Sequence, residues 1–353
     1  MEKEVYYVLG VMSGTSLDGI DIAHIVFEKQ DSWKYEIRTA ETIPYTEDWK
    51  RRLTTAIHFD ENQLIEIDKE YTAFLADVIR KFTTKHDIHE LDAVCSHGHT
   101  IKHEPENGFT LQIGNLPELA SLLKKRVVCN FRVQDVKLGG QGAPLVPIGD
   151  ALLFGNYEFC LNLGGFANVS TSLRGERIAY DICPVNTVMN YLAEQLGQPF
   201  DEGGKIAAGG RLDQRLLNDL NELDFYRQKP PKSLGMEWVY RFIIPRLDKG
   251  MNIPDLMHTY AVHVAEQLAE NLKSSIEASV LITGGGAFNS FLLEELSKRT
   301  STSLVVPSEK LVNYKEALVF GLLGVLRMRG EINTLSSVTG SYRDHSAGEI
   351  FEG

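Results

Sequence analysis

The chain has no excess of basic residues, no long apolar run and no paired cysteines, and each absence excludes a class of protein. Its 353 residues carry 36 Lys and Arg against 48 Asp and Glu, a formal net charge of −12. Nucleic acids and anionic membranes attract basic faces, so neither is an expected partner. No apolar run approaches the roughly 18 residues of a membrane-spanning helix, and no basic-then-apolar leader opens the chain.

Cysteine is scarce, and its spacing excludes the usual metal and disulfide frameworks. The four cysteines are far apart, with no C-x-x-C pair and no zinc spacing. We expect buried, reduced thiols, a cytoplasmic location and no metal-ligand cluster. The four are Cys95, Cys129, Cys160 and Cys183.

The remaining composition is that of a soluble globular protein, with 43% hydrophobic and 24% charged residues. Its length predicts two domains of similar size, and strand patterns that alternate with helix patterns indicate an α/β fold. Residues 61–85 have apolar side chains at three- and four-residue steps, which predicts a helix. We place an N-terminal lobe at 1–131, a Gly- and Pro-rich hinge at 132–150, a C-terminal lobe at 151–330 and a loose polar tail at 331–353.

Each predicted lobe begins with two apolar strands joined by a glycine-containing turn. The first pair spans Val8–Ala23 and the second Phe159–Ser170, which suggests an internal duplication. The first turn is unusually rich in small and hydroxyl residues, from Ser13 to Gly19. Such a turn brings backbone N–H groups close to an anion, so it is either a phosphate cradle or an ordinary polar hairpin loop.

Two further glycine turns follow predicted strands, at 164–165 and 284–286. Three such turns in one α/β chain suggest loops that converge on a nucleotide, although glycines also close ordinary tight turns. No segment matches the G-x-x-x-x-G-K-[ST] pattern, which argues against a P-loop fold.

Several charged or polar residues are candidates for chemistry. Asp181 follows a predicted strand and precedes a helix from Pro184, so it is either a general base or a helix N-cap. His97 and His99 are two positions apart on a predicted strand and should share one face. They offer polar groups to a sugar, join His103 around a metal, or are surface histidines. Arg132 and Glu316 are single charges near predicted cleft edges, where each alone is more often a surface ion.

Together these motifs resemble the anhydro-N-acetylmuramic acid kinase family over about residues 5–328. The resemblance implies a two-lobed actin-like ATPase fold, ribonuclease H-like, with an ATP cleft between the lobes. It also implies ATP and Mg²⁺ as cofactors, an amino-sugar substrate and a role in cell-wall sugar recycling, and it leaves a homodimer open. In this family the 1,6-anhydro bridge is hydrolysed and O6 is phosphorylated. The matching segments are Gly10–Asp21, Ser96–Thr100, His103–Pro105, Thr110–Gly114, Phe131–Arg132, Gly139–Pro147, Leu161–Asn168, Pro231–Ser233 and Thr283–Asn289.

The resemblance also implies roles for individual residues. Asp181 is the implied general base, and His97, Arg132 and Glu316 are the implied sugar-binding residues. The implied ATP-binding residues are Gly14, Thr15, Ser16, Leu17, Asp18, Gly19, Ile20, Asp21, Gly164, Gly165, Gly284, Gly285, Gly286 and Asn289.

The chain departs from the family pattern beside the implied base. The family usually has Asp-Thr-Gly-Pro-Gly-Asn there, whereas this chain has Cys183 and Val185 in place of the two glycines. Glycine permits a positive φ or close ligand approach, and valine permits neither cheaply. Two alternatives therefore stay open: a nucleotide-binding actin-like protein without this activity, and a kinase for a related sugar.

Overall fold

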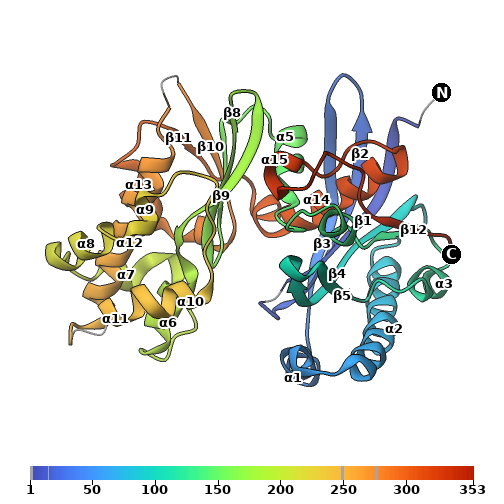
Figure 1. Cartoon of the computed structure of the whole chain (residues 1–353), viewed down its shortest axis with the longest axis horizontal. Helices are drawn as coiled ribbons and strands as arrows, with labels where there is room; N and C mark the ends of the chain where they lie inside the picture. Colours follow the sequence, from blue (N-terminus) through green and yellow to red (C-terminus); the bar gives the residue numbers. More distant parts are fainter. Residues whose placement is uncertain (1–2, 15, 248–249, 275–276) are drawn as a thin grey trace. The chain divides into compact units, whose positions relative to one another are not determined.

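The computed structural model describes residues 3–14, 16–247, 250–274 and 277–353. It divides the chain into two compact units (Figure 1). The first unit comprises Met1–Leu153 and Tyr314–Gly353, and the second comprises Phe154–Asn313.

The first unit is built on a mixed sheet with the strand order β12-β6-β4-β1-β2-β3, and β5 pairs with β4. Strands β1, β2 and β3 form an antiparallel meander, and β4 and β6 extend it in parallel. The strands are β1 (Val5–Ser13), β2 (Gly19–Lys29), β3 (Trp33–Pro44), β4 (Ala93–Glu104), β5 (Phe109–Ile113), β6 (Val127–Cys129) and β12 (Glu349–Phe351).

The second unit repeats this plan in the order β11-β10-β7-β8-β9. It again has an antiparallel meander, β7-β8-β9, extended by two parallel strands. The recurrence of one strand order confirms the α/β class and is typical of the ribonuclease H-like units predicted from the family resemblance. The strands are β7 (Phe159–Leu163), β8 (Phe166–Leu173), β9 (Glu176–Pro184), β10 (Ser279–Thr283) and β11 (Ser303–Val305).

Helix α2 (Glu61–Lys85) occupies the predicted range and covers one part of the first sheet. It begins with a capping box between Asp60 and Gln63, and its apolar face carries buried Leu75 and Phe82. The other helices of this unit are α1 (Glu47–Thr55), α3 (Glu118–Leu123), α4 (Val133–Lys137), α5 (Val146–Leu153), α15 (Ser336–Thr339) and the part of α14 (Glu309–Arg329) from Tyr314 on.

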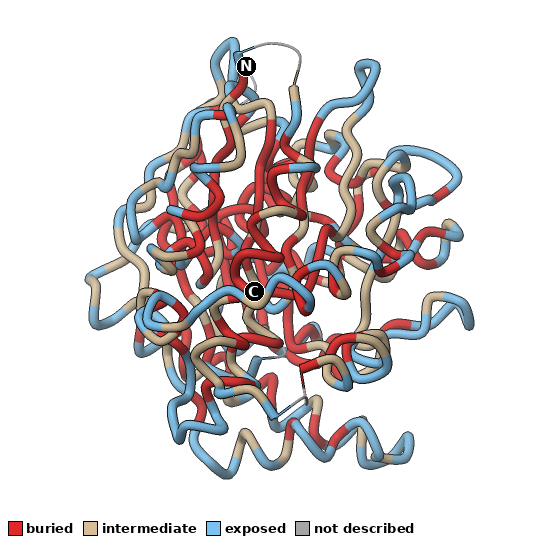
Figure 2. Tube along the Cα trace, turned by 90° about the vertical axis from the view of Figure 1, so that its left-hand side faces the viewer, coloured by how far each residue is buried: buried red, intermediate tan, exposed pale blue. Residues whose placement is uncertain are grey.

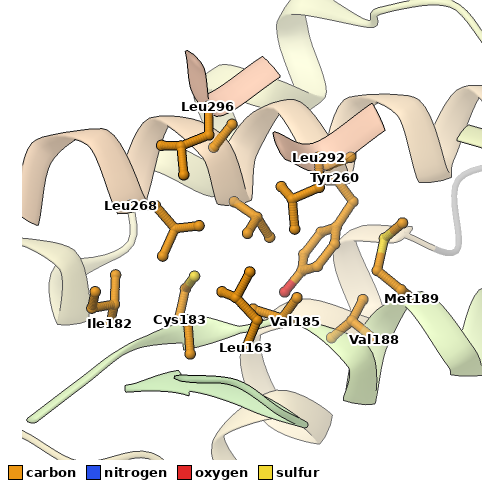
Figure 3. Packing of buried hydrophobic residues seen from close by; sticks show 14 of the residues in the cluster. Leu163, Ile182, Cys183, Val185, Val188, Met189, Tyr260, Leu268, Leu292 and Leu296 are labelled. Atoms are coloured by element: carbon orange, nitrogen blue, oxygen red, sulfur yellow. The ribbon is translucent and has the colours of Figure 1, made fainter. Parts of the chain in front are cut away.

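In the second unit, α12 (Ile253–Asn271) is the central core helix, and twelve of its nineteen residues are buried. Figure 3 shows Tyr260 and Leu268 of α12 packed in one cluster with Leu163 of β7. The other helices are α6 (Asn186–Glu194), α7 (Lys205–Ala208), α8 (Gln214–Asn221), α9 (Asp224–Arg227), α10 (Met236–Trp238), α11 (Ile244–Leu247) and α13 (Ser290–Ser297).

Buried residues follow the strands and the inner helix faces, whereas the connecting loops are mostly exposed (Figure 2). Across the described ranges, no helix combines the length and apolarity needed to cross a bilayer.

The units differ from the predicted lobes in two places. Residues 132–150, the predicted hinge, lie inside the first unit, and residues 314–330, assigned to the C-terminal lobe, belong to it as well. The reason for the second difference is packing: Gly321 of α14 lies against Ile25 and Phe27 of β2, and Phe320 packs on His97 of β4. These contacts join segments about 300 and 220 positions apart, which local patterns do not reveal.

The expectation of a loose tail at 331–353 is wrong. Strand β12 pairs with β6, and Asn333 is fully buried. The Asn333 amide donates to the carbonyl oxygens of Leu323 (3.0 Å) and Ala347 (2.8 Å) and accepts from the Ala347 N–H. Polar side chains are buried at little cost when their hydrogen bonds are satisfied, so a polar composition did not mean disorder here.

Candidate active site

The predicted β1–β2 hairpin is present, and Ser13 at the end of β1 anchors it to the sheet. The buried Ser13 Oγ hydrogen-bonds to Tyr45 Oη (2.6 Å) and His99 Nδ1 (2.8 Å), and Tyr45 in turn bonds Tyr71. Of the predicted phosphate residues, Gly14, Ser16, Leu17 and Asp18 lie in the turn, and Gly19, Ile20 and Asp21 belong to β2. Thr15 lies outside the described residues.

Three charged candidates of the first unit are linked by electrostatic interactions. Asp21 on β2 accepts a hydrogen bond from Thr42 Oγ1 (2.6 Å), and its pKa is raised, mainly by burial and further by Asp18. Desolvation by the surrounding protein raises the pKa of Glu316 on α14. The positive charge of Arg132 lowers this pKa, and the negative charge of Asp21 raises it further. Electrostatic interactions therefore link Glu316 to Asp21 and Arg132, although successive members of this set are about 110 and 180 positions apart in the chain.

Arg132, between β6 and α4, is fixed by two hydrogen bonds. Its Nε donates to His97 Nε2 (2.8 Å) and its Nη1 donates to the Gly142 carbonyl (2.7 Å). Because His97 Nδ1 donates to the Gly98 carbonyl (2.8 Å), His97 is the neutral Nδ1–H tautomer. Burial and Arg132 hold the pKa of His97 well below its usual range, and burial lowers the pKa of Arg132 to about 10, so Arg132 remains charged at neutral pH.

His97 and His99 were predicted to share one face of a strand, but their side chains contact different groups. His97 packs against Phe320 of α14, whereas His99 contacts Tyr45 and Tyr71. Gly98 between them has a φ of +74°, which interrupts the strict alternation of a strand. Burial lowers the pKa of His99 to about 4. No three His, Cys, Asp or Glu side chains within the described ranges gather as a metal site, so the alternative in which His97, His99 and His103 surround a metal finds no support there.

Asp181 lies on β9 with one carboxylate oxygen held and the other unbonded. Its Oδ2 accepts from the Leu234 N–H (2.8 Å), and its own N–H donates to the Lys232 carbonyl (3.0 Å). Within the described part of the chain, Oδ1 has no hydrogen-bond partner. Helix α6 begins with Val185 as its cap and takes no side-chain bond there, so the N-cap alternative for Asp181 is wrong. Burial raises the pKa of Asp181, while the Leu234 N–H lowers it.

The glycine turns of the second unit are shaped by close backbone packing. Carbonyl oxygens of Gly164 and Gly165 accept hydrogen bonds from N–H groups at the start of α6. Gly284 has a φ of +82°, and a Cβ there would lie 2.6 Å from Asn162 Oδ1. Asn289 caps α13 by accepting from the Leu292 N–H (3.0 Å).

A cavity of about 610 Å³ opens beside the glycine turn at 284–286, and all of its lining residues belong to the second unit. The prediction named three of its lining residues, Gly285, Gly286 and Asn289. It missed Asn186 and Asn190 of α6 and the Gly-rich segment around Lys205, whose glycines were the only local signal. The remaining lining residues are Met189, Phe200, Asp201, Glu202, Gly203 and Phe288.

Cys183 and Val185, which replace the two glycines of the family pattern, point into the core of the second unit (Figure 3). They are 0% and 1% exposed, and the φ of Val185 is −127°, so this position needs no glycine. The substituted side chains therefore belong to the core of the second unit.

Comparison with known proteins adds an independent finding. A family model described as anhydro-N-acetylmuramic acid kinase matches residues 6–353. Relatives bearing the same description include those of Sulfurimonas denitrificans (32% identity, covering 98% of this chain and 99% of the relative) and Shewanella loihica (31%, covering 99% of each). The Haemophilus influenzae relative is 31% identical, covering 98% of this chain and 97% of its own.

Similar solved structures are more distant. An activator of 2-hydroxyisocaproyl-CoA dehydratase from Clostridium difficile, with bound ADPNP, has a TM-score of 0.45 and 14% identity, covering 90% of this chain and 94% of its own. A ROK family glucokinase from Streptomyces griseus, in complex with glucose and AMPPNP, has a TM-score of 0.39 and 11% identity, covering 90% and 99%.

Proposed function

The chain belongs to the anhydro-N-acetylmuramic acid kinase family, and we propose from this membership that it uses ATP to convert 1,6-anhydro-N-acetylmuramic acid into the 6-phosphate. The reaction hydrolyses the anhydro bridge and phosphorylates O6, which returns a cell-wall sugar to metabolism. The observation that supports it most directly is the open carboxylate oxygen of Asp181.

Asp181 is the general base in this proposal. Its free Oδ1 takes a proton from water as the water oxygen attacks the anomeric carbon. The bond from that carbon to O6 breaks, and O6 attacks the γ-phosphorus of ATP, which releases ADP. A raised pKa makes the carboxylate a stronger base, and the Leu234 N–H keeps Oδ2 oriented.

The nucleotide is proposed to bind with its adenosine in the 610 Å³ cavity beside Gly284–Gly286. Phosphate contacts are proposed for the hairpin turn from Gly14 and for Gly164 and Gly165. Mg²⁺ commonly binds through one or two carboxylates together with substrate phosphates. Asp21 and the nearby Asp18 fit that donor set and would hold the ion, which neutralises phosphate charge when bound.

Sugar binding is proposed for His97, Arg132 and Glu316, which the first unit brings together. The fixed guanidinium of Arg132 suits the carboxylate of the muramic acid lactyl group, because a planar cation pairs well with carboxylate oxygens. The free cysteines support a reducing, cytoplasmic location for this chemistry.

The alternative of a nucleotide-binding protein without kinase activity depended on the altered residues 183 and 185. Their side chains belong to the core, and no other described feature favours that alternative.

The test is turnover of the purified full chain with Mg-ATP and 1,6-anhydro-N-acetylmuramic acid. We expect ADP and sugar 6-phosphate in equal amounts, and a loss of turnover of about 10²–10⁴-fold in Asp181→Asn with ATP affinity retained. N-acetylmuramic acid and glucose serve as comparison substrates. Absence of product with the anhydro sugar would refute the proposal, and near-normal turnover of Asp181→Asn would refute the base assignment.

A further inference from the structure

The C-terminal segment 333–345 contacts the loop that follows Arg132, and the contact centres on a buried carboxylate. Asp135 of α4 is fully buried. Its Oδ1 accepts a hydrogen bond from Thr339 Oγ1 of α15 (2.7 Å), and its Oδ2 accepts from the Gly142 N–H (2.7 Å). One carboxylate therefore joins a helix near the C-terminus to the loop 138–142, across 204 positions of sequence.

Backbone hydrogen bonds strengthen the same junction. The Gln141 N–H donates to the Thr339 carbonyl (2.8 Å), and the Tyr342 N–H donates to the Leu138 carbonyl (3.1 Å). The loop also packs tightly on the carboxylate, because a Cβ at Gly140 would lie 2.2 Å from Asp135 Oδ2. The loop is thus held on both sides of Gly140.

The held loop in turn fixes Arg132. The carbonyl of Gly142, whose N–H binds Asp135, accepts from Arg132 Nη1 at 2.7 Å, and Arg132 Nε donates to His97. Hydrogen bonds to a charged group are stronger than neutral ones, and a buried chain of them is costly to interrupt.

We propose that Asp135 and Thr339 are positioning residues: the C-terminal segment, acting through the Asp135 carboxylate and Gly142, sets the orientation of Arg132 for sugar binding. The inference rests on the proposed function for the role of Arg132, and it assigns a task to the segment predicted to be a loose tail. Neither residue contacts the sugar in this scheme, and neither belongs to the nucleotide residues.

The test compares three variants of α15 in the full chain. Thr339→Val removes the hydroxyl and keeps the shape, Thr339→Ser keeps the hydroxyl, and Ser336→Ala removes a different hydroxyl bond of the same helix, to Asp344 (2.7 Å). We expect the KM for the anhydro sugar to rise about tenfold in Thr339→Val, and the KM for ATP and kcat to change less than twofold. Thr339→Ser and Ser336→Ala should keep the wild-type sugar KM.

Asp135→Asn should raise the sugar KM further, by about 10- to 100-fold, because it removes the buried charge and leaves one acceptor oxygen where Thr339 and Gly142 now donate to two. If that variant does not fold, Thr339→Val still decides the matter. A lower melting temperature of Thr339→Val with an unchanged sugar KM, or an equal rise in the KM of both substrates, would overturn the positioning role.

Amide hydrogen exchange separates this inference from the proposed function. The peptide that contains Gln141 and Gly142 should exchange about ten times faster in Thr339→Val than in Thr339→Ser. This readout needs no turnover. If the wild type fails to phosphorylate the sugar, the proposed function is lost, while unchanged exchange in Thr339→Val would overturn the link between the segment and the loop.

Discussion

The two units share one strand order but build their functional groups from different materials. In the second unit the main chain supplies the key contacts: Gly284 and Gly286 lie against Leu163, and the N–H of Leu234 holds Asp181. In the first unit the corresponding region depends on side chains that bind one another, from Ser13 and His99 to Arg132 and Asp135. A repeated fold thus does not prescribe a repeated way of holding a ligand.

The largest effect is expected from a change in the main-chain packing of the second unit, at the glycine turn 284–286. Gly284→Ala places a Cβ 2.8 Å from the Leu163 carbonyl group at a φ of +82°. Overpacking and left-handed strain together should lower the free energy of unfolding by about 2–4 kcal/mol, measured by urea denaturation.

Gly285→Ala is the matched control for that change. A Cβ at Gly285 has its nearest neighbour, Asn186 Nδ2, at 3.6 Å, so stability should stay within about 0.5 kcal/mol of the wild type. Equal stability of the two variants would show that the turn is not specified by backbone packing.

A smaller effect is expected from a change in the side-chain network of the first unit. Ser13→Ala leaves Tyr45 Oη and His99 Nδ1 without their shared partner in a buried position, which should cost about 1–3 kcal/mol in the same denaturation experiment. Ser16→Ala changes an exposed hydroxyl of the same hairpin and should stay within about 0.5 kcal/mol. If Ser13→Ala is as stable as Ser16→Ala, the first unit does not depend on this network.

The same contrast explains what the sequence predicted. Glycine turns after apolar strands are local patterns, so the turns at 13–19, 164–165 and 284–286 and the helix at 61–85 were predictable. The side-chain network was not, because its bonds join distant residues: Ser13 to His99, and Asp135 to Thr339. Local sequence patterns do not show which distant residues will bond to each other. For the same reason the polar C-terminal segment was expected to be loose, although its Asn333 is buried.

The smallest expected effect concerns Asp181 and the main chain beside it. As a base, Asp181 must be ionised, so kcat/KM should fall as pH falls through its pKa, which burial raises from its ordinary value. The Leu234 N–H stabilises the ionised form, and Leu234→Pro removes that donor. The pKa should then rise further, so the acidic limb of the pH profile should move to higher pH by about 0.4–1 unit, the equivalent of one hydrogen bond. Leu234→Ala keeps the N–H and should keep the wild-type limb. If the acidic limbs of Leu234→Pro and Leu234→Ala lie at the same pH, the Leu234 N–H does not affect the pKa of Asp181. The contrast between the two units would then not hold at Asp181.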